Sequence, residues 1–351
     1  LKRALITDRK DLLRSDAFRS LVFILLASGI ILGFIYDKIR KEYTIVIIAL
    51  LIVLDLWTAD KRYLDADRFE RPAAIQKSFA PTVADAFILK DQSQHRVLNL
   101  AASPFNDNSP TSYFHKSIGG YHGAKMERYQ ELIDTCIYPG LGAFGGAAQK
   151  AQSVEELQMA YNNTPIPSLN MLNTKYVIYN SSALPLINPK ALGNAWFVEK
   201  PIIVENANKE ISLIKSFNPL KEATIDKIFK DQIINSAYPV LENEKIELVS
   251  YQPDELLYKY SAREEKLAIF SEIYYPAGWK CYIDGKENKY FRADWVLRGM
   301  VVPAGDHEIK FTFRPASYYV GNKVSLASSV LLILLCAGYF ITRFNRKSKP
   351  E

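Results

Sequence analysis

The sequence predicts an α+β membrane protein: three transmembrane helices, an extracytoplasmic mixed α/β region and, after it, an antiparallel β-sandwich. Three observations predict this architecture. Apolar runs of membrane-spanning length stand near both ends of the 351-residue chain, helix-like and strand-like patterns mix between them, and short strand patterns follow one another from residue 245 onward. The mean hydropathy of −0.08 conceals this segregation, because charged stretches offset the apolar runs.

Three runs are apolar and long enough to cross a bilayer, which takes about 20 residues and at least about 17. They cover residues 21–36, 43–57 and 323–342. The first two are slightly short, but Tyr36, Tyr43 and Trp57 can extend them as interfacial anchors. The first run has no charged residue and no polar stripe, so a buried helical hairpin in a water-soluble protein is the less favoured alternative.

Charge predicts which side each loop occupies. By the positive-inside rule, the short loop 37–42 and the basic tail 343–351 are cytoplasmic, and the residues between the second and third spans are extracytoplasmic. Residues 1–20 weigh against this orientation, because their basic residues nearly balance the count. Their pattern predicts an amphipathic helix at the membrane interface, and the alternative is the end of a larger loop.

The extracytoplasmic part divides into a mixed α/β region, 58–240, and a β-sandwich, 241–322. In the first region, helices are expected in part of 70–91 and at 124–137, 153–163 and 218–233, strands at 95–102, 173–180 and 195–206, and a Gly/Ala-rich loop at 140–153. Ser153 and Glu156 form a capping-box pattern. In the second region, six strand patterns fall at 245–252, 255–262, 266–275, 279–291, 295–303 and 307–315.

Composition excludes some classes of function. The net charge of +6 is spread along the chain, so no basic patch predicts nucleic-acid binding. Three cysteines lack any zinc-binding spacing. Cys136 and Cys281 are able to pair in an oxidising compartment, although two separate buried thiols are the favoured alternative.

Several long motifs resemble the C-terminal part of the YfhO family of bacterial membrane proteins. They are "SEIYYPAGWKCYIDGK", "WVLRGMVVPAGDHEIKFTFRP" and "SYFHKSIGGYHGAKMERYQELID", together with "ALGNAWFV" and "DKRYL". The resemblance covers essentially the whole chain. It implies a multi-pass protein of the bacterial cytoplasmic (inner) membrane with a large extracytoplasmic domain, in support of the charge argument.

The family resembles C-type glycosyltransferases, so the resemblance also implies a reaction. A sugar would pass from a polyprenyl-phosphate carrier to a cell-envelope glycan or polymer, with the outer domain capping the site. The partners would be the lipid bilayer, the lipid-linked sugar and that acceptor. The catalytic acid is expected in an early outer loop upstream of Leu1, so this chain is not expected to catalyse alone. Such enzymes sometimes use a divalent metal, but no cofactor or ligand set is visible.

The stretch 112–125 concentrates residues suited to a sugar phosphate. Tyrosines stack on sugar rings, histidines bind hydroxyls, lysines neutralise phosphate, and paired glycines open the backbone N–H groups to an anion at the start of a helix expected from Ala124. The candidate binding residues are Tyr113, His115, Lys116, Gly119, Gly120, Tyr121, His122 and Lys125. The alternative is a glycine-hinged loop with packed aromatics. A metal site at the two histidines is disfavoured, because no carboxylate is adjacent.

Other candidates are weaker. Asp55, near the end of the second span, either lines a cavity or reaches water at the interface. Asp294 and Arg298 are expected to form a salt bridge on one face of a strand. Tyr274, Tyr275 and Trp279 are expected to be structural rather than a carbohydrate platform. The competing functions are a membrane-tethered binding or scaffolding module of the envelope, without catalysis, and a transport component.

Overall fold

The computed structural model describes residues 2–61, 63–64, 69, 71–72, 79–103, 105, 109–121, 123–241 and 243–347, with backbone only for 2–5, 109–110 and 343–347. The chain forms two compact units, Leu1–Ala80 and Pro81–Glu351. Three of the described helices are long and apolar enough to cross a membrane: Ile6–Ile35, Lys41–Asp60 and Ala316–Thr342. These contain the three runs that the sequence predicts.

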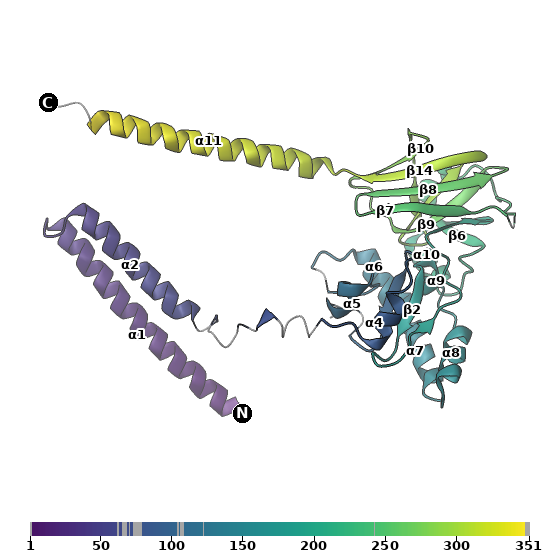
Figure 1. The fold of residues 1–351 in the computed structure, drawn as a ribbon, viewed down its shortest axis with the longest axis horizontal. Helices are drawn as coiled ribbons and strands as arrows, with labels where there is room; N and C mark the ends of the chain where they lie inside the picture. The colour runs from purple at the N-terminus through teal and green to yellow at the C-terminus, as the bar shows by residue number, and fades with distance from the viewer. Residues whose placement is uncertain are drawn as a thin grey trace. The chain divides into compact units, whose positions relative to one another are not determined.

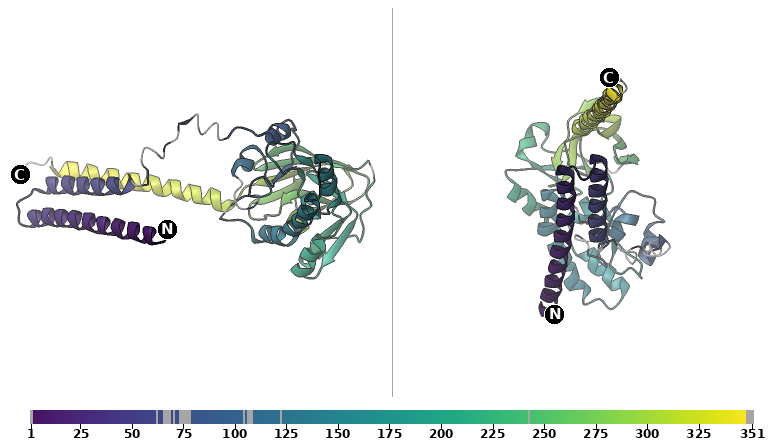
Figure 2. Two further views of the ribbon diagram at one scale, coloured as in Figure 1. Left: turned by 90° about the horizontal axis from the view of Figure 1, so that it is seen from below. Right: turned by 90° about the vertical axis from the view of Figure 1, so that its left-hand side faces the viewer.

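The first unit is a helical hairpin. Helices α1 (Lys2–Ile35) and α2 (Lys41–Asp60) lie side by side in antiparallel directions (Figure 1 and Figure 2). Helix α1 continues without a break from Lys2, so the residues expected to form a separate interfacial helix are an extension of the first apolar helix. Asp55 pairs with Arg19 across the hairpin, with 3.2 Å between Oδ1 and Nε.

The second unit begins with a small sheet among helices. Its strands are β1 (Arg96–Asn99), β2 (Thr174–Ile178) and β3 (Leu186–Ile187), in the order β1-β2-β3 with β1 and β2 parallel. The helices are α4 (Val83–Ile88), α5 (Ser109–Phe114), α6 (Glu127–Leu132), the π-helix η2 (Ile133–Ile137), α7 (Tyr138–Ala148), α8 (Val154–Asn163) and α9 (Pro167–Met171). The Ser153 hydroxyl caps α8 at the N–H of Glu156, as predicted.

The prediction of a Gly/Ala-rich loop at 140–153 is wrong over most of its length. Residues up to Ala148 belong to helix α7, which continues from α6 through the π-helical turn. Tertiary packing outweighs the low helix propensity of glycine here. Phe144 is buried, and the Ile166 side chain lies 3.0 Å from the place a Cβ on Gly140 would occupy. The small residues therefore allow close packing within a helix.

Two larger sheets form the rest of the unit. A six-stranded sheet has the order β4-β9-β13-β12-β6-β5, and a five-stranded sheet has the order β11-β10-β14-β8-β7. The strands are β4 (Ala195–Val198), β5 (Lys200–Val204), β6 (Glu222–Asp226), β7 (Ile246–Gln252), β8 (Glu255–Ala262), β9 (Lys266–Ile273), β10 (Trp279–Ile283), β11 (Lys286–Asn288), β12 (Phe291–Ala293), β13 (Leu297–Val302) and β14 (Gly305–Phe313). Helix α10 (Ala207–Ile214) connects β5 to β6, and α11 (Ala316–Lys347) follows β14.

Two details of the 195–233 segment differ from the sequence prediction. The single strand expected at 195–206 is two strands with different partners, since β4 pairs with β9 and β5 pairs with β6. The helix expected at 218–233 is strand β6 followed by a 3₁₀-helix, Lys227–Gln232. Pairing with β5 and burial of Ala223 and Ile225 decide the outcome, because local propensity is a weak guide beside tertiary contacts.

One hydrophobic cluster draws on both sheets. Phe197, Phe270 and Met300 come from the six-stranded sheet, and Tyr258 and Phe311 come from the five-stranded sheet. A second cluster joins the six-stranded sheet to β1, β2 and the helices. Strands β4, β5 and β6 precede residue 240, so the two regions predicted as 58–240 and 241–322 share one sheet.

Candidate functional site

The stretch 112–125 lies beside strand β1. Val97 donates its N–H to the Lys116 carbonyl oxygen at 2.9 Å, and Ile118 donates its N–H to the Val97 carbonyl oxygen at 3.2 Å. Ser117 therefore pairs with Val97 through an isolated parallel β-bridge at the edge of the small sheet. Ile118 is buried in the larger hydrophobic cluster, which anchors this segment.

His115 is buried, and its ring is occupied by a structural contact. Its Nε2 lies 2.9 Å from Asp85 Oδ1, and its side chain is 4% exposed. Asp85 Oδ2 accepts hydrogen bonds from the N–H and the hydroxyl of Thr82, the residue that caps α4. Burial acts to raise the pKa of Asp85, but hydrogen bonds from Thr82 and His115 hold it below its usual value. The histidine expected to bind a sugar hydroxyl thus clamps the segment to α4.

Lys116 faces a different environment. Its Nζ donates a 2.5 Å hydrogen bond to Gln94 Oε1 and lies 3.0 Å from the ring centroid of Tyr251. Desolvation lowers the pKa of Lys116 to about 8, Arg96 adds to the decrease, and Glu272 opposes it. Within the described part of the chain, the Lys116 ammonium has no ion pair with a carboxylate. It is a cation available to an external anion.

The two side chains that Lys116 contacts line a groove of about 660 Å³. The groove lies where the loop after α4 and the loop before β4 face strand β7. Its walls are formed by Gln92, Ser93, Gln94, Leu192, Gly193, Asn194, Ala195, Ile246, Glu247, Leu248, Val249, Ser250 and Tyr251. Amides, hydroxyls and one aromatic ring are the groups that recognise hydroxyl-rich ligands. We define this cavity as the Lys116 groove, because Lys116, which is not itself a lining residue, contacts two residues of its walls, Gln94 and Tyr251.

A hydrogen-bonded network at the surface holds the loop that carries Gln94. Asp91 accepts hydrogen bonds from Lys175 Nζ at 2.6 Å, from the Tyr176 hydroxyl at 2.9 Å and from the Ser93 N–H at 2.9 Å. Asn173 donates its side-chain N–H to the Gln94 carbonyl oxygen at 2.8 Å. These contacts place the Gln94 side chain next to Lys116 before any ligand binds, so the groove is preorganised. This loop was not predicted to be part of a site, because its local sequence pattern does not distinguish it from any other surface loop.

The other candidates in the stretch do not gather around this groove. Tyr113 and Tyr121 are exposed. The Gly119 N–H is already bonded to Ser117 Oγ at 3.1 Å, and Gly120 adopts a positive φ of 128° in the following turn. Lys125 Nζ donates to the Phe105 carbonyl oxygen at 3.3 Å and to Gln130 Oε1 at 3.2 Å.

His122 lies outside the described residues. The helix expected from Ala124 begins instead at Glu127, after Met126, so the predicted anion site at a helix start directly after the glycines is not formed. In the part of the chain that the structure describes, no three His, Cys, Asp or Glu side chains lie together as metal ligands would.

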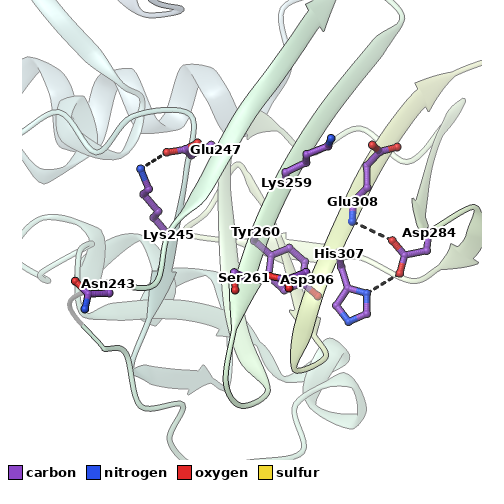
Figure 3. Close-up of a pocket in the computed structure, with 10 residues that line it drawn as sticks. All are labelled: Asn243, Lys245, Glu247, Lys259, Tyr260, Ser261, Asp284, Asp306, His307 and Glu308. Atoms are coloured by element: carbon purple, nitrogen blue, oxygen red, sulfur yellow. Dashed lines mark hydrogen bonds and ion pairs between the residues drawn. The ribbon is translucent and has the colours of Figure 1, made fainter.

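A second cavity, of about 570 Å³, lies on the five-stranded sheet (Figure 3). Two pairs of its charged side chains, Lys245 with Glu247 and His307 with Asp284, satisfy each other. His307 Nδ1 lies 2.5 Å from Asp284 Oδ2, and Glu308 donates its N–H to Asp284 Oδ1. The hydrogen bond that His307 donates to the Asp284 carboxylate raises the pKa of His307. This pair ties the turn at Asp284-Gly285 to β14, so we assign it a structural role.

The predicted Asp294–Arg298 salt bridge is wrong. Asp294 and Trp295 adopt positive φ angles of 47° and 70°, within the tight connection between β12 and β13, so the two residues do not lie along one strand. Asp294 Oδ1 accepts the Thr224 N–H at 2.8 Å. The Arg298 guanidinium lies 4.2 Å from the Trp279 ring centroid, which confirms a structural role for Trp279. Tyr274 also packs on neighbouring rings, whereas Tyr275 is exposed.

A buried charge cluster adjoins Asp294. Glu210, which is fully buried, lies 3.3 Å from Arg292 and accepts the Trp295 N–H at 3.0 Å. Arg292 also pairs with Asp226 at 3.2 Å. Desolvation raises the pKa of Asp294 to about 8 and also raises the pKa of Glu210. Glu210 was not predictable from its local pattern, because a single acid in an amphipathic helix resembles any surface residue.

Asp55 lines a groove of the helical hairpin, and the two buried cysteines of the second unit lie apart from each other. A groove of about 220 Å³ between α1 and α2 is lined by Asp55 and by apolar residues of the two helices. Cys136 and Cys281 are separate buried thiols in different hydrophobic clusters, so no disulfide joins them. Burial raises the pKa of their thiols to about 11 and about 12.

The β-rich C-terminal part of the chain is similar to known bacterial membrane proteins. Residues 216–325 match the profile of the family described as "Bacterial membrane protein YfhO". A stretch of 119 residues is 28% identical to "Uncharacterized protein YfhO" of Bacillus subtilis strain 168, and it covers 34% of this chain and 13% of that protein. No solved structure matches the chain. The three apolar helices agree with a membrane family, and residues 216–325 of the chain are similar to the YfhO family of bacterial membrane proteins.

Proposed function

We propose that this chain is a membrane-anchored, substrate-binding part of a glycosyltransferase-like protein. The protein would transfer a sugar from a polyprenyl-phosphate carrier to a cell-envelope acceptor at the outer face of the bacterial cytoplasmic membrane. The family match and the three apolar helices support a membrane protein of this kind. The observation that carries the proposal is the Lys116 groove, where a cation that has no carboxylate partner among the described residues lies beside amide and hydroxyl side chains.

The chemistry of the groove fits a ligand with both hydroxyl groups and a negative charge. Gln94, Asn194 and Ser250 offer hydrogen-bond donors and acceptors, and Lys116 offers a charge-assisted hydrogen bond. A sugar phosphate or an acidic glycan carries both features. In this proposal the groove binds and orients such a ligand, while the catalytic acid is supplied elsewhere in the protein.

The test is sugar transfer by the full-length protein in nanodiscs that contain a polyprenyl-phosphate sugar. Lys116→Gln removes the charge and is expected to raise KM about tenfold to about a hundredfold, because a hydrogen bond to a charged group contributes about 1.5–3 kcal/mol. The matched control is Lys150→Gln, at an exposed lysine after α7. An unchanged KM for Lys116→Gln would show that the groove does not bind the substrate.

One observation favours a second candidate function, a binding module of the envelope without catalysis. The groove offers hydrogen-bonding side chains such as Gln94, Asn194 and Ser250, and these bind a hydroxyl-rich ligand whether or not a reaction follows. The same experiment separates the candidates. A full-length protein that binds the carrier or glycan through Lys116 but transfers no sugar would be such a module.

A further inference from the structure

The turn between β9 and β10 packs against the junction of β14 and α11. Arg314 donates its backbone N–H to the Gly278 carbonyl oxygen at 2.7 Å. Gly278 has a φ of 116°, and a Cβ at this position would lie 2.8 Å from the Phe313 ring and 2.9 Å from Pro315. The backbone of the turn and the start of the junction are thus in direct contact, so the turn stays within a few ångströms of the place where α11 begins.

The length of α11 determines where the junction of β14 and α11 lies relative to the bilayer. The apolar helix Ala316–Thr342 has 27 residues, with Lys323 as its one charged residue. At about 1.5 Å per residue this helix is about 40 Å long, close to the full bilayer thickness of about 40–45 Å including the headgroups. When α11 spans the membrane, Ala316 therefore lies near the outer limit of the headgroup layer, and Arg314 lies at the lipid surface.

The residues of the turn suit that layer. Tyr275 is 45% exposed, and Pro276 and Ala277 beside it are exposed as well. Tyrosine favours the membrane–water interface, because its ring is apolar and its hydroxyl stays hydrated. Tyr318 and Tyr319, at the start of α11, are also exposed. Behind the turn, the rings of Trp279 and Phe313 lie 5.2 Å apart and support it rigidly.

We propose that residues 275–277 form a lipid-contacting surface, seated in the headgroup layer of the same bilayer that α11 crosses. The partner is the lipid surface, and exposed Arg314 next to the turn adds attraction to anionic headgroups. A second contact beside α11 restricts how the domain tilts about the end of that helix. The inference requires only that α11 spans the membrane, so it is independent of the proposed sugar transfer.

Spin labels at single cysteines test this surface in the full-length protein, reconstituted in nanodiscs with anionic lipid. Cys336→Ala removes the exposed thiol, while Cys136 and Cys281 remain as buried, protonated thiols. Labels are placed by Tyr275→Cys and, as a second site that spares the tyrosine, by Ala277→Cys. Leu332→Cys, in the middle of α11, is the membrane reference.

Met159→Cys is the aqueous reference, at an exposed residue of α8 that lies on the far side of unit 2 from β10 and β14 (Figure 1). We expect an oxygen-to-nickel-chelate accessibility ratio at both turn sites at least about twofold above that at residue 159 and below that at residue 332. Ratios at residues 275 and 277 equal to the aqueous reference overturn the proposal. Loss of access to both reagents means shielding by protein, and it overturns the proposal too.

Discussion

Residues 112–125 and residues 291–299 are both rich in charged and aromatic side chains, and the fold uses them in opposite ways. In the first stretch, two neighbouring side chains point to different places. His115 packs against Asp85, while Lys116 contacts Gln94 in the wall of a groove. In the second, Arg292 and Asp294 enter the interior together with Glu210. Clusters of chemically useful residue types therefore do not by themselves mark a site, because the face that each residue occupies decides its role.

Removing a charge from the buried cluster around Glu210 is expected to destabilise the protein more than any other change proposed here. Arg292→Ala leaves Glu210 fully buried without its closest cation, and we expect it to lower the free energy of unfolding by about 3–5 kcal/mol. The measurement is denaturant unfolding of the protein in detergent. Lys227→Ala, which breaks the exposed pair with Glu205, serves as the control and should cost less than about 1 kcal/mol. Equal costs for the two variants would contradict a buried, stabilising role for the cluster.

The buried carboxyl of Asp294 is expected to make the stability of the protein depend on pH. The pKa of Asp294 is raised by burial from 3.8 to about 8 in the folded protein. Between about pH 4 and about pH 8 the unfolded carboxyl ionises while the folded one stays protonated, so this residue lowers stability as the pH rises through that window.

Asp294→Asn keeps the acceptor for the Thr224 N–H and removes the ionisation. We expect the variant to lose less stability than the original protein between about pH 5 and about pH 8, as thermal unfolding at a series of pH values will show. Some slope will persist, because the pKa of Glu210 is also raised. Parallel stability curves for the two proteins would show that Asp294 ionises normally.

Within residues 112–125, substitutions at the buried and the exposed side chains are expected to change the free energy of unfolding by different, smaller amounts. His115→Ala removes a buried partner of Asp85 and is expected to lower the free energy of unfolding by about 1–3 kcal/mol. Tyr121→Ala, at a side chain that is 84% exposed, should change it by less than about 0.5 kcal/mol. Thermal unfolding of both variants measures the contrast. A tolerated His115→Ala would leave that histidine free for a role in ligand binding.

Strongly periodic parts of the fold were predictable from the sequence. The three apolar runs, the capped helix after Ser153 and the strand Ile309–Phe313 carry patterns that depend on local spacing. Segments whose structure depends on distant partners were not. Strand β6 was mistaken for a helix, and helix α7 was mistaken for a loop, because pairing with β5 and packing against Ile166 are invisible locally.

Hydrophobic length and alternation alone indicate membrane-spanning helices and a β-rich C-terminal region, since both patterns follow from the geometry of helices and strands. The sequence also supplied Lys116 as a candidate. Only the tertiary structure decided that Lys116 meets Gln94 and Tyr251, two residues distant in sequence, while His115 meets Asp85. Those pairings depend on which faces of separate elements come together, and burial of the three hydrophobic clusters, one of which packs Ala84 and Ile88 of α4 on Val97 of β1, fixes that choice.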